Sequence, residues 1–99
     1  MMIEIRRTDE FSRFLTKLRD LKARARILTR VDRISTGNFG DAKSVGGGVS
    51  ELRIDYGPGY RVYFARHGAK LVILLCAGNK KSQSADIELA KELLNELEF

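Results

Sequence analysis

The sequence predicts an α+β fold in which an antiparallel sheet carries helices packed on one of its faces. Apolar residues recur at helical spacing near both ends of the chain, and they alternate with polar residues in its middle part. The predicted order of elements is β-α-α-β-β-β-α. With 99 residues, of which 43% are hydrophobic, the chain is expected to form a single domain over residues 1–99.

The N-terminal third is expected to form a short strand followed by two helices. Residues 2–6 predict the strand, and Thr8 is a favourable N-cap for a helix that ends near Leu18. Asp20 is then expected to cap a second helix that runs to about Ser35. Because the connection between the two helices is so short, they should form an antiparallel hairpin.

The second predicted helix has an apolar face and a separate basic face. Its apolar face consists of Ala23, Ile27, Val31 and Ile34. Basic side chains recur at the same spacing, at Lys22, Arg26, Arg30 and Arg33. Such a stripe is typical of a solvated helix face, but it also suits contacts with RNA phosphates.

Residues 36–48 are rich in glycine and are expected to form a mobile loop that lacks the spacing of a phosphate-binding loop. After this loop the pattern alternates over residues 49–55 and 61–65, which predicts two strands joined by a five-residue turn at 56–60. If the apolar side chains share one face, the register follows. It sets Leu52 and Ile54 opposite Phe64 and Val62, Arg53 opposite Tyr63, and Asp55 opposite Arg61.

Residues 71–77 form the longest apolar run and predict a strand buried on both faces. Ser82 or Ser84 is expected to cap a last helix. The strand at 71–77 should run antiparallel to its predecessor, so its end returns beside Arg61. The sequence therefore predicts that basic side chains converge at one rim of the sheet, namely Arg53, Arg61 and Lys80, with Lys81 next to them.

Several functional classes are excluded by the composition. His67 and Cys76 are the only histidine and the only cysteine, so an intrachain disulfide and a standard zinc site are ruled out. His67 is expected to be solvated in a turn, and Cys76 to be buried and inert. The apolar runs are too short to cross a membrane, and residues 1–7 lack the apolar segment of a signal peptide. We expect a cytoplasmic protein without metal or cofactor.

The net charge of +5 favours an anionic partner, either nucleic acid or an acidic protein. Residues 82–99 carry only one basic and five acidic side chains, so the rest of the chain is more basic than the average. A cluster such as Arg53, Arg61 and Lys80 is suited to the charge of a phosphorane transition state, which several cations can stabilise without a metal. The alternative is a solvated basic rim with ordinary ion pairs.

Two segments of the chain resemble the RelE/ParE toxin superfamily, and in particular its HigB-like branch of addiction-module killer proteins. The first segment is Glu51 to Phe64, which contains Gly59-Tyr60-Arg61-Val62-Tyr63-Phe64. The second is Leu74 to Gln83, which contains Gly78-Asn79-Lys80-Lys81-Ser82. With the early helical hairpin, the resemblance covers nearly the whole chain.

The resemblance implies the toxin of a type II toxin–antitoxin module, which cleaves mRNA in the ribosomal A site without a metal. It implies that Arg53, Arg61 and Lys80 are catalytic. From their positions in the predicted elements, Lys81, Tyr63 and the basic stripe of Lys22, Arg26, Arg30 and Arg33 are the candidate RNA-binding residues. Some relatives use a tyrosine in the C-terminal segment, and residues 82–99 contain none. Tyr63 is either a substitute for it or a packing residue.

The implied partners are the ribosome, mRNA and a cognate antitoxin, a small helix-turn-helix protein encoded by the adjacent gene. Two other functions stay open at this point. One is a ParE-like poison of DNA gyrase that has no enzymatic activity, and the other is an RNA- or ribosome-binding module without catalysis.

Overall fold

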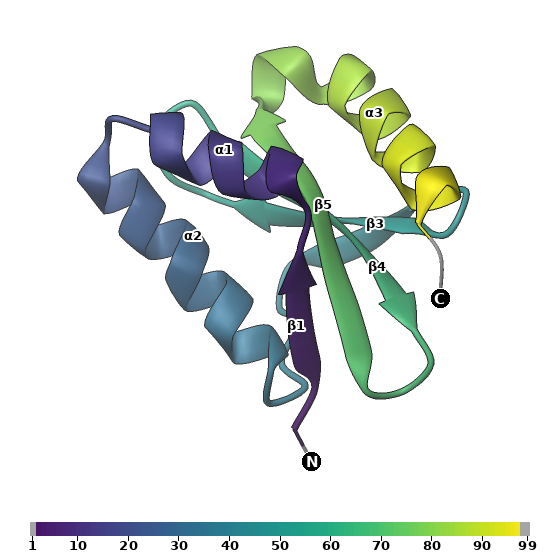
Figure 1. The fold of residues 1–99 in the computed structure, drawn as a ribbon. Helices are drawn as coiled ribbons and strands as arrows, with labels where there is room; N and C mark the ends of the chain where they lie inside the picture. The colour runs from purple at the N-terminus through teal and green to yellow at the C-terminus, as the bar shows by residue number, and fades with distance from the viewer. Residues whose placement is uncertain (1, 98–99) are drawn as a thin grey trace.

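The computed structural model describes residues 2–97, which form a mixed α+β fold with a five-stranded sheet and three α-helices (Figure 1). In chain order the elements are β1 (Glu4–Arg7), α1 (Asp9–Lys17), α2 (Leu21–Ile34), β2 (Ala42–Gly46), β3 (Val49–Ile54), β4 (Tyr60–His67), β5 (Leu71–Asn79), the short 3-10 helix η1 (Lys80–Ser82) and α3 (Gln83–Glu96). Among these residues, no helix combines the length and the apolar character needed to cross a membrane.

The two N-terminal helices begin at the predicted caps. The Thr8 hydroxyl accepts a hydrogen bond from the backbone N–H of Phe11, and the Asp20 carboxylate accepts from Lys22 and Ala23. These acceptors satisfy N–H groups that have no partner inside their own helix. The apolar face predicted for α2 is buried, as is Phe11 of α1.

The sheet is mixed rather than antiparallel, which corrects the prediction. Its strands lie in the order β1-β5-β4-β3-β2. β1 pairs in parallel with β5, Glu4 lying opposite Leu71, whereas the other three pairs are antiparallel. Parallel strands need a long crossover between them. The crossover between β1 and β5 spans most of the chain. The alternation of apolar and polar residues within each strand therefore did not indicate that these two strands pair in parallel.

The expected loop at residues 36–48 contains a strand that the sequence prediction missed. Residues Ala42–Gly46 form β2 at the edge of the sheet, where Ala42 lies opposite Leu52 and Ser44 opposite Ser50. The register shifts between Ser44 and Gly46 at a β-bulge. An edge strand has only one neighbour and buries little, so it can be polar and short.

The register between β3 and β4 differs by two residues from the predicted one. Leu52 lies opposite Val62, Arg53 opposite Arg61, and Ile54 opposite Tyr60. A shift of two keeps every side chain on its predicted face, so the faces are right and the partners are wrong. The reason is Tyr60, which is buried and extends β4 instead of belonging to the turn.

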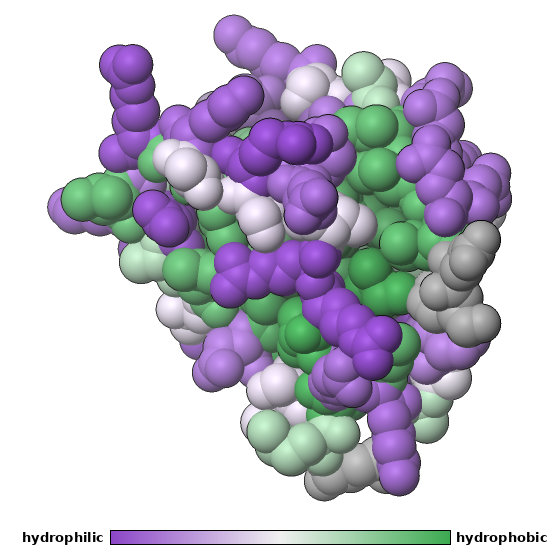
Figure 2. Space-filling view, in the orientation of Figure 1, coloured by the Kyte–Doolittle hydropathy of each residue, from purple (hydrophilic) through white to green (hydrophobic). Residues whose placement is uncertain are grey.

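Helices cover both faces of the sheet, and the prediction of one covered face is therefore wrong. α1 and α2 pack on the face that carries Leu52, Val62 and Leu74. α3 packs on the opposite face, over Tyr63 and Leu75 (Figure 1). β4 and β5 are buried on both sides, so each face needs its own cover. In Figure 2 some apolar surface stays visible between α1 and α3, with hydrophilic side chains around it.

Candidate functional site

Three basic side chains meet in a cavity of about 480 Å³ beside the β3–β4 turn. Arg53 comes from β3, Arg61 from β4 and Lys80 from η1, and all three line the cavity as their positions in the chain predicted. The other lining residues include the carboxylates Asp41 and Asp55 and the glycines of the turn. Lys81 is exposed on η1 but is not among the residues that line this cavity.

The turn between β3 and β4 brings the backbone close to two of these cations. Gly59 adopts a positive φ of 81°, a conformation that favours glycine. A Cβ atom at this position would lie 3.7 Å from Cβ of Lys80 and 3.8 Å from Nη1 of Arg61. Nη1 of Arg61 also donates a hydrogen bond of 3.4 Å to the Gly59 carbonyl. The turn thus forms one wall of the site.

Lys80 is placed by a helix cap on the residue before it. The Asn79 side chain accepts hydrogen bonds from the backbone N–H groups of Lys81 and Ser82, at 2.9 and 3.3 Å. Ser82 Oγ in turn donates to the Asp86 carboxylate at 2.5 Å. This start of η1 and α3 packs against Gly78, which lies opposite Arg61 in the β4–β5 ladder.

Arg61 forms an ion pair with Glu51, whose carboxylate has no access to solvent. Its side chain is 12% exposed, and its Nε lies 3.5 Å from Oε2 of Glu51, whose side chain is 0% exposed. The same oxygen accepts a hydrogen bond of 2.7 Å from Gln83 at the start of α3. Burying a carboxylate is costly unless it is paired and hydrogen-bonded, and here the Arg61 cation and the Gln83 amide both stabilise Oε2 of Glu51.

Tyr63 lies directly opposite Glu51 and is fully buried under α3, which contradicts its predicted contact with RNA. Burial, followed by the negative charge of Glu51, raises the pKa of its hydroxyl above the ordinary value. Within residues 2–97 the hydroxyl has no hydrogen-bond partner. Tyr63 is therefore a packing residue. The sequence did not indicate this, because an alternating pattern does not reveal that a helix covers its face.

Arg53 is paired with an acidic residue that sequence reasoning missed. Its Nη2 donates to Oδ1 of Asp41 at 3.0 Å, and both side chains are about half exposed. The backbone N–H of Arg53 also donates to the Asp41 carbonyl. Asp41 reaches the site because β2 folds back on β3. The missed strand therefore explains the missed residue.

A second cavity, of about 420 Å³, adjoins the first. It is lined by Arg26, Arg30 and Arg33 of the predicted basic stripe, and it shares Ile54 and Asp55 with the first cavity. The Arg26 guanidinium lies over the ring of Tyr56, 4.9 Å from its centroid. Lys22, the fourth member of the stripe, is exposed on α2 and is not among the lining residues.

Arg30 differs from the rest of the stripe because its guanidinium is used inside the protein. It donates hydrogen bonds to the carbonyls of Arg53, at 2.7 Å, and of Phe39, at 3.4 Å. These bonds tie α2 to β3 and to the segment that precedes β2. Arg30 therefore has a structural role, whereas Arg26 and Arg33 are exposed to solvent.

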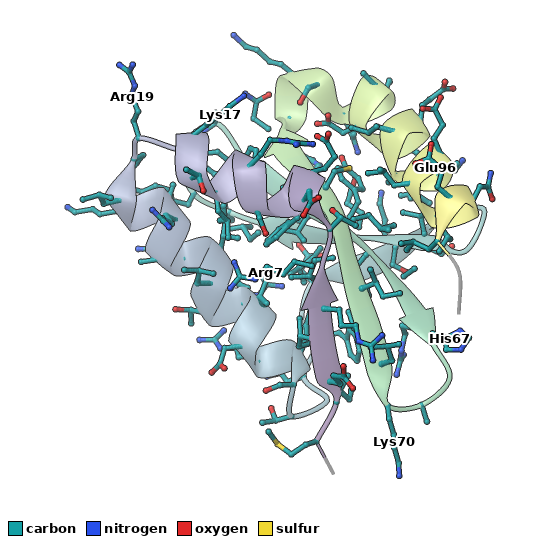
Figure 3. The ribbon with its side chains drawn as sticks, in the orientation of Figure 1. Arg7, Lys17, Arg19, His67, Lys70 and Glu96 are labelled. Carbon is teal, nitrogen blue, oxygen red and sulfur yellow. The ribbon has the colours of Figure 1, made fainter. Side chains whose placement is uncertain are left out.

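The other candidate residues lie away from this site. His67 is exposed at the end of β4, and Figure 3 shows it near Lys70 at the β4–β5 turn. Cys76 is buried, and its environment raises the pKa of the thiol from 9.0 to about 12, chiefly through burial. Over residues 2–97, no group of three or more histidine, cysteine or acidic side chains is arranged to hold a metal ion.

Comparison with known proteins places the chain in a family. The chain belongs to the family described as phage-derived protein Gp49-like (DUF891), which matches residues 13–95 and is an addiction-module toxin-like family. A relative from Haemophilus influenzae, which bears the name "Uncharacterized protein", is 52% identical over 97 residues and is aligned over 98% of both chains. No solved structure matches the chain.

Proposed function

We propose that this chain is the toxin of a type II toxin–antitoxin module and that it cleaves mRNA on the ribosome without a metal ion. The observation that carries the proposal is the cavity in which Arg53, Arg61 and Lys80 meet. Family membership supports the toxin role, and the resemblance of residues 51–64 and 74–83 to RelE-like and HigB-like toxins supports the reaction.

In the proposed reaction the 2′-oxygen of one nucleotide attacks the adjacent phosphorus. The bond from phosphorus to the 5′-oxygen of the next nucleotide breaks, which leaves a 2′,3′-cyclic phosphate and a 5′-hydroxyl. The 2′-hydroxyl loses a proton, and the leaving oxygen gains one. Negative charge accumulates on the phosphorane, so prearranged cations stabilise the transition state more than the ground state.

The three cations are held to different degrees, which suggests different roles. Arg61 is nearly buried and fixed by Glu51, so it is suited to hold the scissile phosphate in one geometry. Arg53 is half exposed and paired with Asp41, so it must exchange a carboxylate for the phosphate when RNA binds. Lys80 is exposed, and its ammonium group is suited to neutralise charge on a phosphate or leaving oxygen.

The RNA strand next to the scissile phosphate would continue into the second cavity. Arg26 and Arg33 would contact phosphates there. Lys22 and Lys81 would extend this basic surface on either side, in contact with mRNA or ribosomal RNA. Asp55 lines both cavities, so the strand would pass close to this carboxylate on its way from one to the other.

The proposed partners in the cytoplasm are the ribosome, mRNA and a cognate antitoxin. An addiction-module toxin needs an antitoxin in the cell that produces it. Charge complementarity suits an acidic segment of that antitoxin placed over Arg53, Arg61 and Lys80, where it would exclude RNA.

The proposal is tested by inducing the protein from a tightly repressed promoter and mapping the 5′ ends of cellular mRNA. The variants are Arg53→Ala, Lys80→Ala and Arg61→Ala, with Lys70→Ala as a matched control. Lys70 is exposed at the β4–β5 turn and has the same charge as the removed groups. Arg61→Ala leaves Glu51 buried without its cation, so its fold is checked by circular dichroism.

New 5′ ends in phase with codons, lost in the three site variants and kept in Lys70→Ala, are the expected result. Growth arrest without new ends would contradict the nuclease assignment. In that case, DNA cleavage complexes formed by purified protein and gyrase would identify a gyrase poison. Ribosome binding that leaves RNA ends unchanged would identify a binding module.

A further inference from the structure

Glu51 is the only charged residue among the fully buried side chains of residues 2–97. It lies on β3 two residues before Arg53, on the face of the sheet that α3 covers. A buried ion pair contributes little to stability compared with apolar residues of the same volume. The presence of a carboxylate here therefore requires another explanation.

The surroundings of Glu51 connect it to the candidate site on two sides. Oε2 forms an ion pair with Nε of Arg61 at 3.5 Å, a contact that is not a hydrogen bond, and it accepts the 2.7 Å hydrogen bond from Gln83. Gln83 is the first residue of α3 and directly follows η1, the segment that carries Lys80. One carboxylate oxygen is thus shared by the side chain beneath the cavity and by the helix start beside it.

The orientation of Arg61 follows from this contact. Glu51 faces the Nε edge of the guanidinium, while Nη1 lies next to Gly59 at the wall of the cavity. An arginine on an exposed strand samples many rotamers and loses that freedom when it binds a phosphate. An arginine held by an ion pair has lost part of that freedom beforehand, so its guanidinium is already placed at the wall of the cavity.

We propose that Glu51, supported by Gln83, is a positioning residue that presents Arg61 to the scissile phosphate. The inference rests on the proposed function for its kinetic consequence, but its geometric part is independent of catalysis. Glu51 itself does not touch RNA, because its side chain has no exposed surface. Loss of the carboxylate should lower the rate of cleavage while leaving RNA affinity nearly unchanged.

The test follows the Nε–H of Arg61 by NMR in the purified protein. Its ¹H–¹⁵N signal is assigned by its disappearance in Arg61→Lys. Hydrogen exchange at this site is then compared among the unmodified protein, Glu51→Gln, Gln83→Ala and a matched control, Glu88→Gln, on an exposed position of α3. Gln83→Ala removes only the supporting amide, so it keeps the test decisive if Glu51→Gln fails to fold. The same proteins are assayed for single-turnover cleavage of mRNA on ribosomes and for RNA binding.

The buried Nε–H of Arg61 should open to water more often once the ion pair with Glu51 is lost. The expected result is exchange at Nε about tenfold faster in Glu51→Gln, with a smaller increase in Gln83→Ala and none in Glu88→Gln. The cleavage rate should fall in the same order, with binding changed less than about twofold. Unchanged exchange in folded variants would overturn the inference, as would faster exchange with full cleavage activity. If the unmodified protein does not cleave mRNA, the proposed function fails, and the exchange data still decide whether Glu51 positions Arg61.

Discussion

Arg53 lies directly opposite Arg61 in the ladder between β3 and β4. Like charges in this position repel each other and destabilise a sheet. The protein offsets the repulsion with two separate carboxylates, Asp41 for Arg53 and Glu51 for Arg61. Two cations are thereby kept side by side with their outer groups at one cavity, an arrangement that a fold optimised for stability alone would avoid.

Asp41→Asn should increase RNA affinity. The substitution removes a negative charge from the cavity and releases Arg53 from a competing ion pair. The pair is half exposed, so the expected gain is small, about twofold to fivefold at low salt, and it should shrink as salt is added. Fluorescence anisotropy with a short single-stranded RNA measures it. Asp32→Asn, an exposed carboxylate on α2, is the control, and an equal gain there would indicate a general charge effect.

Arg33→Ala should affect RNA binding and Arg30→Ala should affect stability, although both remove one charge from the same helix face. Arg33→Ala is expected to reduce the salt dependence of RNA binding by about one phosphate contact and to leave stability unchanged. Arg30→Ala is expected to lower the free energy of unfolding by about 1–3 kcal/mol, because two backbone carbonyls lose their donor. Urea denaturation and salt titrations of binding separate the two effects. Equal behaviour of the two variants would contradict the structural role of Arg30.

Gly78→Ala should destabilise the start of α3 next to the site. A Cβ atom at Gly78 would collide with the Asp86 carboxylate and would lie 2.6 Å from Ser82 Oγ. The expected cost is about 1–3 kcal/mol, as for other overpacked positions. It is measured by urea denaturation. Because Asp86→Ala vacates much of the space, the double variant should recover part of the loss, and strictly additive effects would contradict the clash.

The stability of the protein should fall as pH rises from about 9 towards 12. Burial raises the pKa of the Cys76 thiol from 9.0 to about 12, so the folded state keeps a proton that the unfolded state releases above pH 9. The buried Tyr63 acts in the same direction from its ordinary value of 10.0. Denaturation curves between pH 7 and 10.5 should show a shallower loss in Cys76→Ala. A slope that the substitution leaves unchanged would show that the thiol titrates equally in both states.

The success and failure of sequence reasoning can be traced to particular residues. Helix caps such as Thr8 and Asp20 were predictable because they act on N–H groups two or three positions away. Alternation assigned Arg53 and Arg61 to one face, but their pairing depends on the turn. Glycine and proline predict a turn there, but they do not show that β4 begins at Tyr60 and that Tyr60 pairs with Ile54. The predicted meeting of Arg53, Arg61 and Lys80 was still correct, because a register shift of two residues leaves each side chain on its predicted face of the sheet.

What could not be predicted depends on contacts between distant segments. Asp41 reaches Arg53 only because a polar edge strand folds back, and polar edge strands lack an apolar signature. Glu51 and Tyr63 belong to an alternating pattern that is typical of a solvated face. That face is buried only because α3, more than thirty residues after Glu51, packs on it. The hydrogen bond from Gln83 of α3 to Glu51 has no sequence signature.

The pairing of β1 with β5 also has a consequence for how the molecule assembles. β1 lies at the edge of the sheet and pairs only with β5, so it has no neighbouring strand until Leu71–Asn79 is in place. The loop that this pairing closes is more than sixty residues long. Contacts so distant along the chain form late and slow folding. Gln83 and Lys80 come later still in synthesis. A chain still being translated therefore lacks the groups that complete its own cavity, and the protein acquires its site only when nearly all of it has been made.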